Sequence, residues 1–314
     1  MTAIIELDRI RTALRNIDVV RDIEAGFVAY SRGEVVVPPV GEMLFDDPRG
    51  EAHIKYGFIK GDDWFVIKVA SGFYDNFKLG LPTNSGLMLL FSQKTGVLDA
   101  VLLDEGILTA ERTAAAGAVV ARHMAPKNVR RIGMLGTGDQ ARRQLRYLAP
   151  IIGCREVLLW GRSDDKIAAC RHDVEEAGFS VESTKDAAEL GSADLIVTVT
   201  AATEPLLTGD DIGPGTHITA VGSDTAEKQE LDVGILARAD VVVADSLEQC
   251  RSRGEIFQAV KAGAIGPDQP VELGSMIAGQ VPGRTSEEQI TVADLTGVAV
   301  QDIQISKAVY RALT

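Results

Sequence analysis

The segment RIGMLGTGDQA, residues 131–141, decides the fold of the central part of this chain. Its apolar start is typical of a buried strand, and a helical stretch begins after Gly138. Gly136 permits a tight turn, Gly138 lets a pyrophosphate approach the backbone, and Ala141 lets the helix pack closely on the strand. The amino end of the helix then faces the phosphates with its partial positive charge. This order of strand, turn and helix predicts a dinucleotide-binding loop; a purely structural glycine turn is the alternative.

Short runs rich in Val, Ile and Leu alternate with helical stretches after this loop. Near-continuous apolar strands between helices are typical of a parallel sheet that is covered on both faces. The runs lie at residues 156–161, 181–183, 193–200, 217–222 and 239–246. The sequence therefore predicts a doubly wound, Rossmann-type α/β domain, with bounds that we place at residues 126–298.

The first 125 residues follow a different pattern. Apolar residues recur every three or four positions from Leu7 to Val20, which predicts one amphipathic helix. An alanine-rich helix is expected at about 106–123, and strand-like runs precede it at 53–59, 64–70 and 86–92. We expect an α+β domain over 1–125, completed by a last helix within 299–314.

Length, charge and composition exclude several classes of protein. The chain has 314 residues, which suits two domains, and its net charge of -13 argues against a nucleic-acid partner. No apolar run reaches the roughly 20 residues that cross a bilayer, and the amino end lacks an apolar signal core. Cys154, Cys170 and Cys250 are far apart, and the four histidines are scattered. We therefore expect neither disulfides nor a metal, and a cytoplasmic location.

The residue that reads the adenosine ribose is expected about 20 residues beyond the glycines, at the end of the second strand. Arg162 and Ser163 stand there in place of the usual acid, and a cation and a hydroxyl suit a 2′-phosphate. This favours NADP(H), although Asp164 keeps NAD(H) possible and Arg162 could be a solvated loop residue. The whole set expected to contact the cofactor comprises Gly136, Thr137, Gly138, Asp139, Gln140, Arg162, Ser163, Thr200, Val221 and Gly297.

Five stretches of the chain together resemble the ornithine cyclodeaminase/mu-crystallin family. They are VIKVASGF (66–73), LTAERTAAAGAVVARHMAPK (108–127), IGMLGTGDQAR (132–142), HITAVGSDTAEKQEL (217–231) and ADLTGVAVQDIQISK (293–307). The resemblance implies a homodimer, with the first domain binding substrate and forming the dimer. It also implies an enzyme that works at the α-carbon of amino or imino acids and moves hydride to or from a nicotinamide. Some members close ornithine to proline with loss of ammonia, others reduce imino acids or aminate keto acids, and mu-crystallin is a ketimine reductase.

Three polar residues match the expected chemistry. Lys68 lies inside an apolar strand-like run, so it must either reach water or find a partner. The resemblance implies that Lys68 and Arg112 hold a substrate carboxylate, with Lys68 also beside the reacting carbon. It implies that Asp224 orients or protonates the substrate nitrogen. The alternatives are an edge-strand lysine that faces water, a helix-surface arginine and an aspartate that caps the next helix.

One position departs from the family pattern. Members often carry a second carboxylate-binding arginine near residue 40, where this chain has Gly41, and Lys55 is the candidate substitute. Lys228 and Glu230 match the family, but the sequence assigns them no physical role.

Three functions remain open at this stage. The leading hypothesis is an NAD(P)H-dependent reductase of an α-imino acid. The second is a cyclodeaminase, a lyase that recycles bound NAD, and the third is a non-catalytic, crystallin-like ligand binder. The retained Asp224 favours the lyase, whereas Gly41 and Arg162 favour the reductase.

Overall fold

The computed structural model describes residues 2–73 and 75–314. The chain forms two compact units: unit 1 contains Met1–Arg112 and Val298–Thr314, and unit 2 contains Thr113–Gly297. The first division falls inside helix α3 (Ile107–Met124), whereas we placed the boundary after that helix. Hydrogen bonds explain the difference, because Arg112 bonds Asp302 of unit 1 while Thr113 O accepts from Gln144 of unit 2.

Unit 2 is built on a parallel sheet whose strands run in the order β10-β9-β8-β11-β12-β15-β13-β14. The strands are β8 (Ile132–Leu135), β9 (Glu156–Trp160), β10 (Ser180–Thr184), β11 (Leu195–Thr198), β12 (His217–Ala220), β13 (Val241–Ala244), β14 (Val271–Glu272) and β15 (Thr291–Asp294). The order reverses beside β8, since β9 and β10 extend to one side and β11 and β12 to the other. The predicted doubly wound α/β fold is confirmed, with its topological switch point at the carboxyl ends of β8 and β11.

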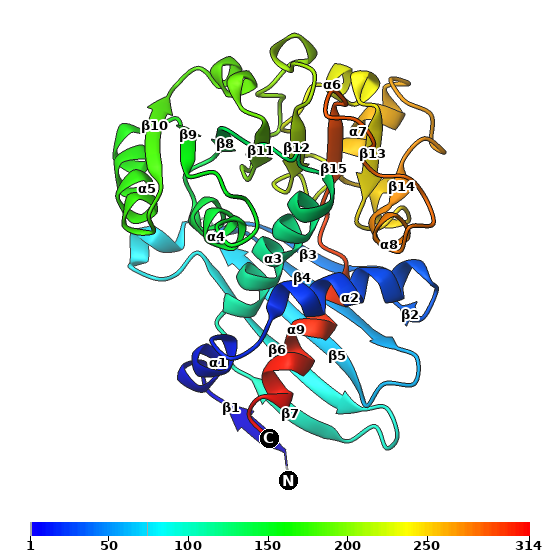
Figure 1. Cartoon of the computed structure of the whole chain (residues 1–314). Helices are drawn as coiled ribbons and strands as arrows, with labels where there is room; N and C mark the ends of the chain where they lie inside the picture. The colour runs from blue at the N-terminus through cyan, green and yellow to red at the C-terminus, as the bar shows by residue number, and fades with distance from the viewer. Residues whose placement is uncertain (1, 74) are drawn as a thin grey trace. The chain divides into compact units, whose positions relative to one another are not determined.

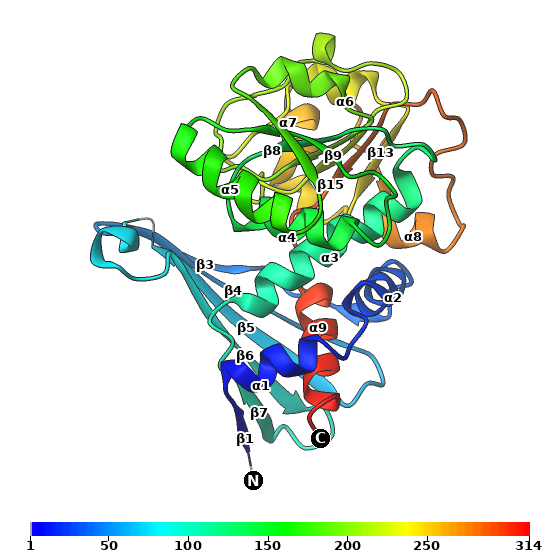
Figure 2. The same ribbon diagram turned by 60° about the vertical axis from the view of Figure 1, so that its left-hand side comes forward.

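Helices cover both faces of this sheet. Figure 2 shows α4 (Asp139–Leu148) and α5 (Asp164–Glu176) on one side of the strands, with α6 (Val233–Arg238) and α7 (Gly254–Lys261) on the other. On the α6 and α7 side, alternate strand residues pack with helix side chains in one apolar core that includes Leu135, Leu158, Ile196, Ile218, Val292, Leu236 and Ile256. The remaining short elements are α8 (Leu273–Ile277), η2 (Ala187–Ser192), η3 (Gly209–Asp211) and η4 (Gln249–Arg251).

Unit 1 is a mostly antiparallel sheet with strand order β1-β7-β6-β5-β4-β2, in which β3 also pairs with β4. The strands are β1 (Ala3–Ile5), β2 (Val35–Val36), β3 (Gly41–Asp46), β4 (Arg49–Ile59), β5 (Trp64–Phe73), β6 (Asn84–Ser92) and β7 (Leu98–Leu102). Among these described strands, β1 and β7 alone pair in parallel. The last helix, α9 (Ala299–Arg311), packs against β4, β5 and β6 and against α2 (Figure 1). The carboxyl-terminal helix therefore covers the middle of this sheet.

The prediction of one helix from Leu7 to Val20 was wrong. The structure has α1 (Leu7–Leu14) and α2 (Val19–Ser31), separated by a short turn. Asp18 ends the continuity, because its carboxylate accepts a hydrogen bond from Arg21 N at 3.0 Å and so caps the second helix. Among the described residues, no helix is both long and apolar enough to cross a membrane.

Candidate functional site

Unit 1 buries a group of charged side chains around Asp302 of α9. Asp302 Oδ1 accepts from Arg112 Nε at 2.9 Å, and Asp302 Oδ2 lies 3.2 Å from Lys68 Nζ. Arg112 Nη1 also donates to Gln301 Oε1 at 3.1 Å. These contacts bring together β5, α3 and α9, three elements that are remote in the sequence. Two of the predicted site residues, Lys68 and Arg112, thus lie side by side.

The strand register brings a further cation to this group. Lys68 lies on β5 between β4 and β6, directly opposite Lys55 of β4. Lys55, Lys68 and Arg112 are each less than a tenth exposed. The alternatives of a water-facing lysine and a helix-surface arginine are therefore wrong, because both side chains are buried in the folded chain. Gly41, the position where an arginine was expected, begins β3 opposite Ile54 and has no side chain to offer. In this pair of strands, Lys55 of β4 is the cation that acts on Asp302.

The charges of this group shift one another's protonation. Burial lowers the pKa of Lys68 and the neighbouring Arg112 lowers it further, although Asp302 opposes both effects. Burial alone would raise the pKa of Asp302, but Arg112, Lys68 and Lys55 together hold it below its usual range. Asp302 is therefore ionised and faces Lys55, Lys68 and Arg112, while the buried carboxyl group of Asp104 also acts on Lys68. Asp302 was not singled out from the sequence, although the polar pair Gln301-Asp302 interrupts the apolar residues Val298 to Ile303 and was a visible signal.

In unit 2, the glycine turn has the geometry expected for a pyrophosphate. Gly136 has a φ of 131°, and a Cβ there would lie 2.9 Å from Val199 Cγ2, so the turn requires glycine. A Cβ on Gly138 would meet nothing within 4 Å, which leaves open space beside the amino end of α4. Ala141 is fully buried. The residues present therefore fit a dinucleotide phosphate at the helix amino terminus.

The end of β9 presents the groups expected to read the ribose. Arg162 is exposed and has no ion pair within the described part of the chain, and Ser163 precedes the first residue of α5 without capping it. Asp164 forms an ion pair with Lys185 at 2.7 Å. The carboxylate that kept NAD(H) possible is thus already engaged, whereas the guanidinium of Arg162 projects into solvent.

The other expected cofactor residues differ in their surroundings. Asp139 pairs with Arg143 at 2.6 Å, and Gln140 accepts from Gln144 at 3.4 Å. Thr200 follows β11 and Val221 follows β12, both at the carboxyl edge of the sheet. Gly297 N donates to Asp245 Oδ2 at 2.7 Å, so its amide already has a protein acceptor. Thr137 is half-buried between the two glycines.

Asp224 lies in the segment that follows β12. Its Oδ1 accepts from Lys228 Nζ at 2.6 Å, and its backbone carbonyl accepts from Arg253 at 3.3 Å. Asp224 is not a helix cap, since Asp232 caps α6 by accepting from Gly234 N at 2.8 Å. The side chain of Asp224 is 40% exposed.

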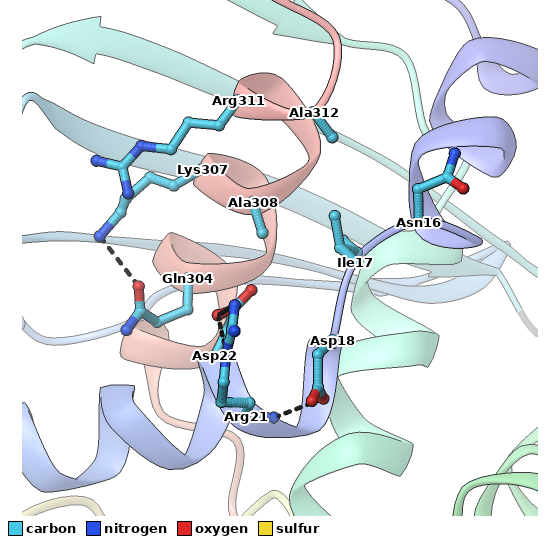
Figure 3. A pocket seen from close by; sticks show the side chains of 10 residues that line it. All are labelled: Asn16, Ile17, Asp18, Arg21, Asp22, Gln304, Lys307, Ala308, Arg311 and Ala312. Carbon is cyan, nitrogen blue, oxygen red and sulfur yellow. Dashed lines mark hydrogen bonds and ion pairs between the residues drawn. The ribbon is translucent and has the colours of Figure 1, made fainter.

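A hollow in unit 1 of about 470 Å³, drawn in Figure 3, lies on the outer side of α9 and is lined by Lys307, Arg311 and residues of the α1–α2 turn. Lys307 is paired with Asp62 and Gln304, and Arg311 with Asp62 and Asp63. Successive residues are about 100° apart around a helix, which places Asp302 on the opposite side of α9. This hollow is therefore separate from the buried charged group around Asp302. Within the described residues no cluster of His, Cys, Asp and Glu could hold a metal.

Known proteins resemble the chain along almost its whole length. Residues 2–314 match the ornithine cyclodeaminase/mu-crystallin family. The chain is 41% identical over 300 residues to an uncharacterized cyclodeaminase of Sinorhizobium fredii, which covers 94% of this chain and 91% of the relative. It is 35% identical over 292 residues to the iminosuccinate reductase of Paracoccus denitrificans, covering 91% and 89% of the two chains. An archaeal alanine dehydrogenase dimer with bound NAD superposes with a TM-score of 0.91 at 32% identity, covering 99% of this chain and 95% of that one.

Removing the charge of Asp302 should destabilise unit 1. In Asp302→Asn the cations Lys68 and Arg112 stay buried without their carboxylate, so the free energy of unfolding at pH 7 should fall by about 3–5 kcal/mol. Because the pKa of Asp302 is lower in the folded state than in the unfolded state, the stability that its charge contributes is fully present above the unfolded-state pKa. This contribution is lost as the pH falls through the folded-state pKa. The difference from wild type should therefore shrink below about pH 4. Urea unfolding followed by circular dichroism at pH 7 and pH 3 measures both effects.

Asp8→Asn is the matched control for this prediction. Asp8 is 95% exposed and 3.5 Å from Arg11, so its neutralisation should change stability by less than about 0.5 kcal/mol. Equal stability of the Asp302→Asn and Asp8→Asn variants would contradict the electrostatic account of the buried group.

Proposed function

The chain belongs to the ornithine cyclodeaminase/mu-crystallin family, as the sequence resemblance indicated, and on that premise we propose that it is a nicotinamide-dependent reductase of an α-imino acid. The observation that carries the proposal is the group of buried cations in unit 1. Lys55, Lys68 and Arg112 all act on the one carboxylate of Asp302, so a second carboxylate is electrostatically favoured beside them. An α-imino acid supplies that carboxylate next to its C=N carbon.

Each residue has a defined part in this reaction. A reduced nicotinamide, when bound, supplies the hydride that adds to the C=N carbon. The π electron pair of the double bond passes to nitrogen, which takes one proton and becomes the amine. Lys68 and Arg112 bind the carboxylate and so orient the carbon, while Asp224 holds the nitrogen and delivers the proton. The iminosuccinate reductase among the relatives supports the proposed reaction, the reduction of an imino acid.

A cyclodeaminase is the second candidate. The retained Asp224 and its ion pair with Lys228 provide a proton-transfer group of the kind needed when ammonia leaves, and a named cyclodeaminase is among the relatives. That reaction ends with the nicotinamide in the state in which it began, so it consumes no added cofactor. Net cofactor oxidation therefore distinguishes the two candidates.

One assay panel tests the proposal. The purified protein is incubated with NADH or NADPH and each of pyrroline-2-carboxylate, piperideine-2-carboxylate, pyruvate with ammonia, and oxaloacetate with ammonia. Ornithine without added cofactor tests the lyase. We expect stoichiometric cofactor oxidation with at least one imino acid. Conversion of ornithine to proline, with no cofactor oxidation by any imino acid, would favour the cyclodeaminase, and inactivity throughout would leave the ligand binder.

We propose that NADP(H) is the preferred cofactor, although the alanine dehydrogenase neighbour holds NAD. Arg162 is exposed and forms no ion pair with the residues that the structure describes, whereas Asp164 is engaged by Lys185. Because one charge-assisted phosphate contact contributes about 1.5–3 kcal/mol, Arg162→Ala should weaken NADPH binding by roughly tenfold or more and leave NADH binding nearly unchanged. Fluorescence titration of both cofactors measures this.

Arg171→Ala serves as the matched control for Arg162→Ala. Arg171 lies on α5, the helix that begins two residues after Arg162, and pairs with Glu175 at 2.8 Å, so its loss should alter neither affinity. An equal loss of NADH and NADPH affinity in Arg162→Ala would show that Arg162 does not read the 2′-phosphate.

Asp224 should act where a proton moves. Asp224→Asn keeps the shape of the side chain and removes its charge, so turnover should fall by about 10²–10⁴-fold. The Michaelis constant should change little, because the carboxylate of the substrate is held by other residues. Steady-state kinetics at saturating cofactor give both parameters. Asp232→Asn is the control: asparagine caps a helix as well as aspartate does, so its activity should match wild type. A fully active Asp224→Asn enzyme would remove Asp224 from the mechanism.

We further propose that unit 1 forms a homodimer. On β5, Phe65, Ile67 and Val69 are half-exposed and alternate with the buried Val66 and Lys68. Large exposed apolar side chains also gather on β3 and around η1 (Asn76–Leu79), at Met43, Leu44, Phe45, Phe77, Leu79 and Leu81. Apolar surface of this kind is typical of a protein–protein interface, and the archaeal neighbour is a dimer. Sedimentation velocity at micromolar concentration should give twice 33.5 kDa; a fully active monomer would contradict the proposal.

A further inference from the structure

Glu230 is a buried carboxylate in unit 2 on which three donors converge. Its Oε1 accepts from Thr200 N at 2.6 Å, and its Oε2 accepts from Thr198 Oγ1 at 2.7 Å and from Gly222 N at 2.9 Å. Thr200 lies just beyond β11 and Gly222 just beyond β12. One side chain therefore fixes, through their backbone amides, the two segments that leave adjacent strands at the carboxyl edge of the sheet.

The close approach of these segments depends on the small size of Gly222. A Cβ at this position would lie 2.1 Å from Thr200 O and 2.6 Å from Glu230 Oε2. Backbone hydrogen bonds at Glu230 and at its neighbour Gln229 add further links between the segments. The carbonyl of Glu230 accepts from Leu206 N at 2.8 Å, and Gln229 N donates to Ala202 O at 2.9 Å. The segments 199–207 and 221–231 are thus joined along their length.

The segment after β12 also carries Asp224. Ser223 Oγ donates to Lys228 O at 2.6 Å, and Lys228 Nζ donates to Asp224 Oδ1 at 2.6 Å. The turn that presents Asp224 is closed on itself by these two bonds. This turn is attached to the sheet at Gly222, which precedes Asp224, and at Glu230, which follows it.

Glu230 is itself held in place by a second carboxylate. Glu255 of α7 accepts from Glu230 N at 2.7 Å and from Leu231 N at 3.2 Å. Burial raises the pKa of Glu230 to about 7, while the hydrogen bonds from Thr198, Thr200 and Gly222 oppose that rise. The pKa of Glu255 is raised by burial and then by Asp294, and the charge of Glu230 raises it further. Experiments at pH 8 therefore examine Glu230 mainly as the carboxylate.

We propose that Glu230 is a positioning residue, whose carboxylate fastens the segments after β11 and β12 to each other and so holds Asp224 in place for proton transfer. The link to catalysis rests on the proposed function, because it takes Asp224 as the proton donor. The fastening itself concerns only the backbone of unit 2. The two parts can therefore be tested separately.

Glu230→Gln is the decisive variant, since glutamine keeps the volume and loses one acceptor. The amide offers one oxygen for the two backbone amides of Thr200 and Gly222, and its NH₂ group would face the donor that remains. Hydrogen–deuterium exchange at pH 8 should then accelerate by about tenfold in peptides covering 199–207 or 221–229, the factor expected for one lost backbone bond. Turnover should fall by at least about tenfold, with the Michaelis constant for the imino acid changed less than about threefold.

Two further variants calibrate the result. Glu182→Gln makes the same substitution on the exposed β10, where Glu182 pairs with Arg131 at 3.0 Å, and should change neither exchange nor turnover. Thr198→Val removes the hydroxyl donor and leaves both amides bound, so it should show a smaller acceleration confined to the same peptides. It carries the test if Glu230→Gln is not recovered folded.

Two outcomes would overturn the inference in different ways. Unchanged exchange in 199–207 and 221–229 for Glu230→Gln, or for Thr198→Val in its place, would remove the fastening role. Faster exchange with undiminished turnover would remove the link to Asp224. A wild-type protein that reduces no imino acid would instead overturn the proposed function, while the exchange result still decides the fastening.

Discussion

The ion pairs of Asp302 are the interaction on which unit 1 depends. An ionised carboxylate with no access to water is tolerated only when cations and hydrogen bonds compensate for its lost hydration. Lys68 from β5 and Arg112 from α3 supply that compensation, so the carboxyl-terminal helix α9 is attached to the centre of the sheet by charge as well as by apolar packing. The same arrangement concentrates positive charge in the interior, since Lys55 also acts on this carboxylate. We propose that a structural requirement, the burial of Asp302, thereby creates a binding preference for a second carboxylate.

Unit 2 satisfies its buried acids in another way. Glu230, Glu255 and Asp294 accept hydrogen bonds from backbone amides, and burial raises the pKa of each. Amide donors are fixed in direction, unlike the ends of long cationic side chains, so a carboxylate that they hold defines the position of the backbone around it. This suits the carboxyl edge of a parallel sheet, where strands end and irregular segments must be placed accurately for a cofactor and a substrate. Asp302 is thus compensated by cations, whereas Glu230, Glu255 and Asp294 are held by backbone amides, as Asp104 of unit 1 also is.

Features that depend on local sequence pattern were predicted correctly, whereas features that depend on contacts between distant residues were missed. The glycine turn at residues 136–138 and the parallel strands around it were evident from spacing and composition, and the doubly wound fold is confirmed. The break between α1 and α2 was missed, because the apolar period continues through the turn while Asp18 caps the second helix. Asp302 was missed because its partners lie about 190 and 234 positions away in the sequence, a separation at which no periodicity operates. Lys228 is four residues from Asp224, and the sequence assigned this spacing no role. The structure shows that the two side chains form an ion pair within a turn.

In the proposed reaction, the α-carbon of an imino acid receives hydride while the buried cations hold its carboxylate. The most direct measurement is the reduction of a cyclic imino acid by NADPH carrying deuterium at both C4 positions, with the product examined by mass spectrometry and proton NMR. The account predicts one deuterium per product molecule, located at the α-carbon, and one equivalent of cofactor oxidised. Amino acid product without deuterium at that carbon, or formed without net cofactor oxidation, would contradict it.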